Sequence, residues 1–383
     1  MRHVPFFLAA FAWNYALGMT WLVVPLYGHA RGLSGAELGI LFSLPSIAQL
    51  AINLVGGAYV DRKGGRRILL VSSALLAAGG AVMPFTERFA TIFGAQLLLV
   101  LARSTFWPAS WAIAADLPGN RGAQAGRFNA VTNLGQILGN GACGFILATG
   151  GFTVTFFVLA ALGIGALLFA LATPAAPRKA AAAGGLFGHY RVLARVPMMR
   201  YGMLCGYLSA LPFSLAMSFY PLLLKFQGFG EEASGLLLAL RAVGGIGAGL
   251  IVARFVKTGP ASPWPVIAGA CTAVGVGLQP LVEHWAGVGG LLFALGVGSS
   301  LLSVYFQVTI GELVPAQMRG SAMALAGLGW GLAHLTTPLV MGLLSDRYGL
   351  SAGFYAMGAV ALLAVAGLAR LRGWAFSRTQ FSP

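Results

Sequence analysis

Charged side chains are scarce in this sequence. Asp, Glu, Lys and Arg make up only 9% of the 383 residues, whereas hydrophobic types make up 58% and the mean hydropathy is +0.83. A soluble globular protein carries about 25% charged residues. The deficit excludes an ordinary soluble domain, because a chain this apolar has most of its side chains in contact with lipid or other buried helices. We therefore expect an all-α integral membrane protein in a lipid bilayer.

Several chemical motifs are also missing. The chain has no Cys-x-x-Cys pair or His-rich tract for a structural metal, no GxxxxGK[ST] loop for ATP, and no Ser/His/Asp cluster for catalysis. Its three cysteines lie in apolar runs, and their odd number argues against a disulfide framework. The net charge of +15 comes from basic residues scattered in short loops, so no nucleic-acid partner is expected. We expect neither an enzyme nor a bound cofactor.

Twelve apolar runs are long enough to cross a bilayer as helices, which takes about 20 residues each. The first run resembles a signal peptide, but it lacks an Ala-x-Ala-like cleavage site and is as long as the later runs, so we interpret it as a helix. The predicted spans are 5–27, 37–59, 67–85, 90–115, 123–148, 152–173, 199–224, 233–255, 264–282, 287–312, 321–344 and 351–371.

The basic residues support this count through the positive-inside rule. With both termini in the cytoplasm, 18 of the 24 Lys and Arg residues fall in cytoplasmic segments, four in outer loops and two inside spans. This distribution predicts a protein of the cytoplasmic (inner) membrane with both termini cytoplasmic. The basic segment 174–198 predicts a cytoplasmic linker, with a short interfacial helix at 186–195. It separates an N-terminal six-helix bundle (1–173) from a C-terminal one (199–383).

The two predicted bundles repeat each other. At one offset of 196 residues, four pairs coincide at the same points of the topology: Pro25 with Pro221, Gly32 with Gly228, Gly39 with Gly235, and Asp116 with Glu312. When Arg121 is laid on Arg319 instead, Gln136 matches His334. Secondary transporters commonly combine two such repeats around a site at the middle of the membrane. The repeat therefore favours a transporter that moves a small-molecule substrate by alternating access.

One short loop concentrates charge between the second and third predicted helices. It carries Gly57, Asp61, Arg62, Gly64, Arg66 and Arg67 in the pattern Gly-x-x-x-Asp-Arg-x-Gly followed by basic residues. In this position the pattern resembles the corresponding loop of the major facilitator superfamily, and it departs from it at Gly65, where a basic residue is common. The topology and the repeat extend the resemblance over essentially the whole chain, so it implies twelve transmembrane helices in two six-helix pseudo-repeats.

The resemblance implies a cytoplasmic latch that holds the two halves together when the transporter opens outward. Asp61 would face the start of the eleventh helix, near Arg319, where the helix dipole favours a carboxylate. Arg66 would pair with Asp116 at the end of the fourth helix. In the second half the offset places Lys257 at the position of Asp61, so a second latch should be weak or absent. The alternative is that these charges only set the topology.

Two further motifs resemble those of the superfamily's drug–proton antiporters in altered form. The fourth helix has the arginine of an Arg-x-x-x-Gly pattern as Arg103, but Trp107 replaces the glycine. The fifth helix has Gly135, Gly139, Asn140, Cys143 and Gly144 where the antiporters have Gly-x-x-x-Gly-Pro-x-x-Gly-Gly. These glycines predict close packing of the fifth and eighth helices. The departures weaken the case for a proton-driven exporter.

Three basic residues lie well inside predicted spans, away from the span ends: Arg103, Arg241 and His334. All nine acidic residues lie at helix ends or in loops, so the middle of the membrane has cations and no carboxylate. Such residues are costly in a membrane and usually functional. In one interpretation Arg241 and His334 are counter-charges for an anionic solute, and His334 is also the best proton carrier. In the other, the arginines are structural, and Arg103 stacks on Trp107 and Trp111.

Uncharged polar and aromatic residues in the spans complete the candidate cavity. They are Asn14, Tyr15, Asn129, Asn133, Gln136, Asn140, Tyr305 and Gln307, with Trp13, Phe213 and Trp330 to cover the apolar parts of a solute. The alternative for each polar residue is a hydrogen bond between helices.

The sequence thus predicts a secondary transporter of a small organic solute, acting as a monomer. Proton-coupled export of drug-like or metabolite compounds is the leading hypothesis, and it depends mainly on the resemblance. Carriage of an organic anion by Arg241 is the second hypothesis. A membrane enzyme or assembly scaffold is the third, and the absence of catalytic motifs counts against the enzyme.

Overall fold

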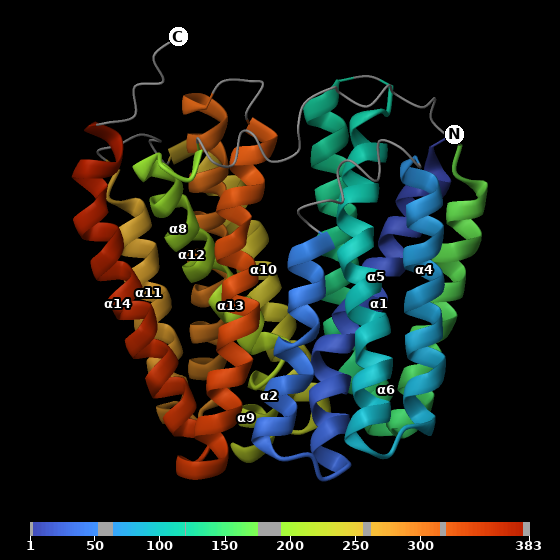
Figure 1. The fold of residues 1–383 in the computed structure, drawn as a ribbon. Helices are drawn as coiled ribbons and strands as arrows, with labels where there is room; N and C mark the ends of the chain where they lie inside the picture. The colour runs from blue at the N-terminus through green and yellow to red at the C-terminus, as the bar shows by residue number, and fades with distance from the viewer. Residues whose placement is uncertain are drawn as a thin grey trace. The chain divides into compact units, whose positions relative to one another are not determined.

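All regular secondary structure in the described part of the chain is helical (Figure 1). The computed structural model describes residues 3–52, 64–118, 120–174, 193–255, 262–314 and 319–377. The first half contains α1 (Val4–Ala30), α2 (Gly35–Ser43), α4 (Gly65–Val82), η1 (Met83–Phe85), α5 (Phe89–Ala115) and α6 (Arg121–Ala172). The second half contains α8 (Pro197–Ala216), α9 (Tyr220–Phe226), α10 (Glu231–Phe255), α11 (Trp264–Leu278), η2 (Gln279–Leu281), α12 (Trp285–Leu313), α13 (Arg319–Tyr348) and α14 (Leu350–Ser377).

The helices account for the twelve predicted spans. Within the described residues, nine helices are long and apolar enough to cross a membrane, or ten if α8 and α9 form one span. The 52-residue α6 breaks at Gly151, where φ is +68°, and so supplies two spans rather than one. The ten spans counted above, the second span of α6 and the 25-residue α10 together make the twelve spans expected from hydropathy. The predicted interfacial helix at 186–195 lies almost entirely outside the described residues.

The seventh predicted span is not one continuous helix. The chain leaves helical geometry after Ala216 and resumes it at Tyr220. Pro221 stands in the first turn of α9. A proline has no N–H for the carbonyl four residues back, here that of Met217, and its ring clashes with that carbonyl. Pro221 therefore accounts for a missing hydrogen bond at the start of α9, whereas Pro25, which matches it in the repeat, lies inside the continuous α1.

Two pairs of turns support the predicted repeat. Gly32 and Gly228 both have positive φ (+79° and +84°). The same three backbone hydrogen bonds surround each glycine. The N–H of the preceding residue donates to the carbonyl four residues back, that of the glycine to the carbonyl three back, and that of the following residue to the carbonyl five back. Gly151 and Gly349 also have positive φ (+68° and +84°) and are separated by 198 residues. That is the offset that lays Arg121 on Arg319. Positive φ favours glycine strongly, so equivalent turns retain it.

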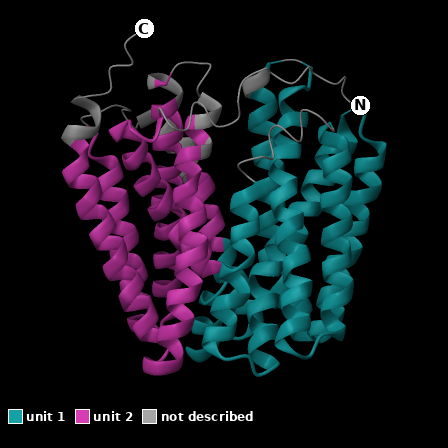
Figure 2. Ribbon diagram, in the orientation of Figure 1, with its two compact units in different colours: residues 1–182, 217–239 teal, residues 183–216, 240–383 magenta. Residues whose placement is uncertain are grey.

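The chain divides into two compact units, shown in Figure 2. Unit 1 comprises Met1–Ala182 and Met217–Ala239, and unit 2 comprises Ala183–Ala216 and Leu240–Pro383. Unit 1 thus includes α9 and the first turns of α10, which the sequence assigned to the C-terminal bundle. The division into bundles 1–173 and 199–383 joined by a linker stays a prediction.

Glycines allow equivalent helix pairs to pack closely within each unit. In unit 1, a Cβ at Gly135 would lie 2.7 Å from the carbonyl oxygen of Phe11, so α6 packs tightly on α1. In unit 2, a Cβ at Gly206 of α8 would lie 3.0 Å from the carbonyl oxygen of Ala326 of α13. The predicted contact of the fifth and eighth helices is also present in unit 1, where a Cβ at Gly235 would lie 2.7 Å from the carbonyl oxygen of Asn140. Small residues at such crossings let backbones approach without a side chain between them.

Candidate functional site

Unit 2 brings four of the predicted site residues into one cluster. The guanidinium carbon of Arg241 (α10) lies 4.8 Å from the ring centroid of Phe213 (α8). The Phe213 ring is 5.3 Å from Trp330 and 6.2 Å from His334, both on α13. His334 stacks on Trp330, with centroids 5.4 Å apart and an interplanar angle of 21°. We call these four residues the cation–aromatic cluster.

The cluster places two ionisable groups in a largely buried, apolar setting. Arg241 is 4% exposed and His334 is 6% exposed, whereas Phe213 and Trp330 are half-buried. The contact of Arg241 with Phe213 is a cation–π interaction, which is worth about 2 kcal/mol or more when desolvated. The accessible aromatic surfaces can cover a flat apolar group, and the cation beside them can attract negative charge.

Close packing of two helices fixes the backbone that carries Arg241. A Cβ added at Gly296 of α12 would overlap the carbonyl oxygen of Arg241 and lie 2.9 Å from the backbone nitrogen of Gly245. Real Cβ atoms essentially never approach other heavy atoms that closely. Gly296 therefore allows α10 to lie against α12 at the level of Arg241.

The hydrogen bond of His334 assigns its tautomer. Its Nδ1 lies 2.9 Å from the carbonyl oxygen of Trp330, one helical turn earlier. Because a carbonyl only accepts, Nδ1 carries the proton and donates it. Uptake of a second proton then takes place at Nε2.

Unit 1 contains a second buried arginine with uncharged partners. Arg103 of α5 is 7% exposed. One terminal nitrogen donates to Oε1 of Gln49 at 2.9 Å, and the other lies 3.2 Å from Sδ of Met217. Its Nε has no hydrogen-bond partner among the described residues. Sequence analysis identified Arg103 but neither of its partners, although Gln49 is a polar residue inside an apolar span.

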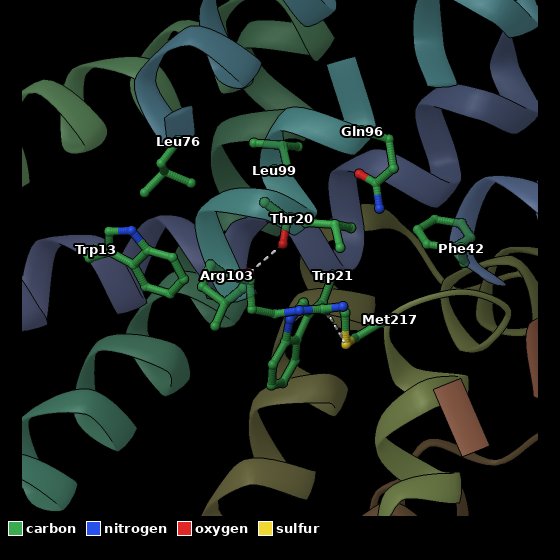
Figure 3. A pocket seen from close by; sticks show the side chains of 11 residues that line it. Trp13, Thr20, Trp21, Phe42, Leu76, Gln96, Leu99, Arg103 and Met217 are labelled. Atoms are coloured by element: carbon green, nitrogen blue, oxygen red, sulfur yellow. Dashed lines mark hydrogen bonds between the residues drawn. The ribbon is translucent and has the colours of Figure 1, made fainter. Parts of the chain in front are cut away.

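The predicted stacking of Arg103 on two tryptophans is wrong. Trp111 instead makes an edge contact with Phe128 of α6, with centroids 4.9 Å apart, and Trp107 contacts the same ring at 6.3 Å. Residues four and eight positions apart share a helix face, but Phe128 packs against the tryptophan side chains there. Arg103 extends instead toward Met217 (Figure 3).

A small cavity of about 20 Å³ lies beside Arg103 in unit 1. Its lining comes from α1, α2, α4 and α5 together with Met217, and it includes Trp13, Trp21 and Gln96 (Figure 3). Trp13 is fully buried and stacks on Phe106 at 3.9 Å. Neither Trp13 Nε1 nor Gln96 Oε1 has a hydrogen-bond partner.

The other predicted polar site residues are distributed over both units. Gln136 donates to Oδ1 of Asn14 at 2.9 Å, so these two residues join α6 to α1, as the helix–helix alternative predicts. Tyr15 and Asn133 are half-buried on the same two helices. In unit 2, Tyr305 is buried and lies 6.5 Å from Tyr201.

The predicted latch lies partly outside the described residues. Gly57, Asp61 and Arg62 fall there, as does Lys257. Gly64 precedes α4 with φ of +83°, and Asp116 ends α5. The guanidinium of Arg66 donates to the carbonyl oxygens of Ala170 and Leu171 at the end of α6. Its pairing with Asp116 stays a prediction.

No metal centre is evident where the side chains are described. Among those residues, no three His, Cys, Asp or Glu side chains lie close enough together to hold a metal ion. The polar groups of both sites are arginines, amides, an imidazole and indoles, which suit hydrogen bonding to a solute.

Comparison with known proteins gives consistent relationships. The family model described as Major Facilitator Superfamily matches residues 6–284 and 281–375. Quinolone resistance protein NorA of Staphylococcus aureus is 26% identical over 170 residues, which are 44% of this chain and 44% of NorA. Multidrug resistance protein 2 of Bacillus subtilis strain 168 is 25% identical over 150 residues, which are 39% of this chain and 37% of that protein. The chain thus matches less than half the length of these curated relatives.

Solved structures with the same fold cover nearly the whole chain. A bacterial homologue of the human lysosomal transporter Spinster, in an inward-facing and unoccupied conformation, has a TM-score of 0.79 at 15% identity, covering 99% of this chain and 98% of its own. The nucleoside transporter NupG has a TM-score of 0.76 at 13% identity, covering 96% and 98%. At these identities the likeness establishes the fold alone.

Proposed function

The chain belongs to the major facilitator superfamily and is a multi-pass membrane transporter, and from that premise we propose that it exports small organic compounds in exchange for protons. The names of NorA and of multidrug resistance protein 2 support export of drug-like compounds. The protein would lie in the inner membrane as a monomer, with both termini in the cytoplasm. It would move its substrate by alternating access of a site near the middle of the membrane.

The cation–aromatic cluster is the observation that carries this proposal. Phe213 and Trp330 are half-buried aromatic rings that can cover a flat, apolar solute. His334 stacks on Trp330 and is the titratable residue of the cluster closest to neutrality in its ordinary pKa. A proton on Nε2 adds positive charge beside the rings, which weakens the binding of a cationic solute there. Proton and solute would then compete for the cluster, and competition for one site is what exchange requires.

Carriage of an organic anion is the second candidate, and Arg241 favours it. The guanidinium lies over Phe213, so an aromatic carboxylate could stack on the ring side of the cluster while its acid group contacts the cation. A proton on His334 would strengthen the binding of that anion. The anion and the proton would therefore travel together, which is the opposite coupling to exchange.

Transport into liposomes distinguishes the two candidates. The purified protein would be reconstituted with an imposed pH gradient, and the movement of ethidium, a planar cation, and of benzoate, a planar anion, would be measured. We expect ethidium to move in the direction opposite to the protons. We also expect His334→Gln to abolish this movement. Arg347→Gln, at the exposed end of α13, is the matched control for Arg241→Gln.

Each outcome assigns the cluster a role. Benzoate movement along with protons, lost in Arg241→Gln and unchanged in Arg347→Gln, would replace export by anion carriage. Ethidium movement that is equally fast in wild type and His334→Gln at every pH would refute the proposed part of His334 in proton exchange.

A further inference from the structure

Among the residues that the structure describes, none provides a counter-charge for the buried Arg103. Its two partners, the amide oxygen of Gln49 and the sulfur of Met217, are both uncharged. Every acidic residue in the described part of the chain lies at a helix end or in a loop, whereas Arg103 lies near the middle of α5. A charged group out of water without an opposite charge is strongly disfavoured. An anion bound next to this guanidinium would therefore stabilise the protein.

The cavity beside Arg103 has the size and the donors that a small anion needs. Its volume of about 20 Å³ exceeds the roughly 10–15 Å³ that one water molecule requires by the same measure. Within the described residues, Nε of Arg103 and Nε1 of Trp13 are buried N–H groups of the lining that have no hydrogen-bond partner. Gln96 lies seven residues before Arg103, so on the same face of α5, and rotation of its amide presents an NH₂ group.

We propose that this cavity is a binding site for a small monovalent anion, with Arg103 as its main ligand. Chloride or a carboxylate group is somewhat larger than a water molecule and fits with a small movement of the surrounding side chains. The anion could be an inorganic ion from solution or the acid group of an organic solute, and both share the chemistry of one negative charge accepting N–H donors. The site lies within unit 1 and does not depend on whether the chain exports or imports.

Thermal unfolding of the detergent-purified full chain tests the site without any transport assay. The midpoint would be measured in sodium gluconate, whose anion is too large for the cavity, while chloride or formate replaces gluconate at constant ionic strength. We expect a saturable rise in the midpoint of about 2–4 °C for the wild-type protein. Arg103→Gln should lose the rise, whereas Arg347→Gln should keep it.

A second variant covers the case in which Arg103→Gln fails to fold. Gln96→Glu places a carboxylate in the cavity as a built-in counter-charge. It should raise the midpoint in gluconate to at least that of the wild-type protein in saturating chloride, and it should abolish the response to added anions.

The outcomes separate the two sources of the anion and leave the proposal open to refutation. A response to both chloride and formate supports an inorganic ion, and a response to formate alone supports the acid group of a solute. An identical midpoint in gluconate, chloride and formate would overturn the proposal. So would a saturable response that persists in Arg103→Gln or in Gln96→Glu.

Discussion

Replacing Gly296 by alanine should separate two helices and displace the arginine between them. The added Cβ would overlap the carbonyl oxygen of Arg241 and lie 2.9 Å from the backbone nitrogen of Gly245, so α10 must move away from α12. Overpacking of this kind costs about 1–3 kcal/mol. Because backbone rather than a flexible side chain is in the way, the clash cannot be relieved by a change of rotamer.

Gly290 on the same helix provides a matched control. A Cβ at that position meets nothing within 4 Å. Both substitutions replace glycine by alanine in a helix interior, which favours the helix by about 1 kcal/mol. This gain is common to the two variants and cancels when they are compared. The difference in stability between Gly290→Ala and Gly296→Ala should therefore equal the overpacking term of about 1–3 kcal/mol.

Unfolding in detergent measures this difference, and ligand response reports on Arg241. Gly296→Ala should unfold at a lower temperature than Gly290→Ala and should lose whatever solute binding depends on Arg241. Equal stability of the two variants would show that α10 and α12 do not pack closely at Gly296. The fixed position of Arg241 would then need another explanation.

Three further changes test other contacts. Asp61→Asn should leave expression nearly normal and reduce transport sharply if the latch exists, and normal transport in liposomes would contradict the latch. Asn14→Leu leaves the amide of Gln136 buried without its acceptor and should lower the free energy of unfolding by about 1–3 kcal/mol. The double variant Asn14→Leu with Gln136→Leu should recover part of this stability in a denaturation assay. Ser209→Ala removes one of two reciprocal hydrogen bonds between α8 and α12 and should cost about 0.6 kcal/mol. A cost above about 2 kcal/mol would show that the Ser209 hydroxyl contributes more than this bond.

Hydropathy and charge were sufficient to predict the helices because the bilayer imposes strict physical limits. A span must be about 20 apolar residues long, and basic residues remain on one side. The cation–aromatic cluster could be anticipated for a similar reason, since Arg241 and His334 are costly in lipid and must face the protein interior. Their partners Phe213 and Trp330 lie on two other helices, and only the fold shows that these helices meet there.

The surroundings of Arg103 could not be predicted to the same degree. Spacing along one helix correctly placed Trp107 and Trp111 on the same face as Arg103, but it carried no information about Phe128, which lies on α6 and packs against them. Gln49 and Met217 come from distant parts of the chain, and neither carries a charge that would mark it in the sequence. The break before α9 was likewise not predicted. Pro221 is visible in the sequence, but membrane helices often tolerate proline, so it did not indicate a break.

The four glycine turns also record where the two halves have diverged in length. Gly32 and Gly228 are 196 residues apart, whereas Gly151 and Gly349 are 198 apart, so the second half has gained two residues between these turns. The gain falls between Glu312 and Arg319, where six residues replace the four that separate Asp116 from Arg121. Two extra residues within a span would rotate the rest of that helix by about 200°, turning buried groups such as His334 toward lipid. The difference in length thus lies between two spans, and the spans on either side of it have the same register in both halves.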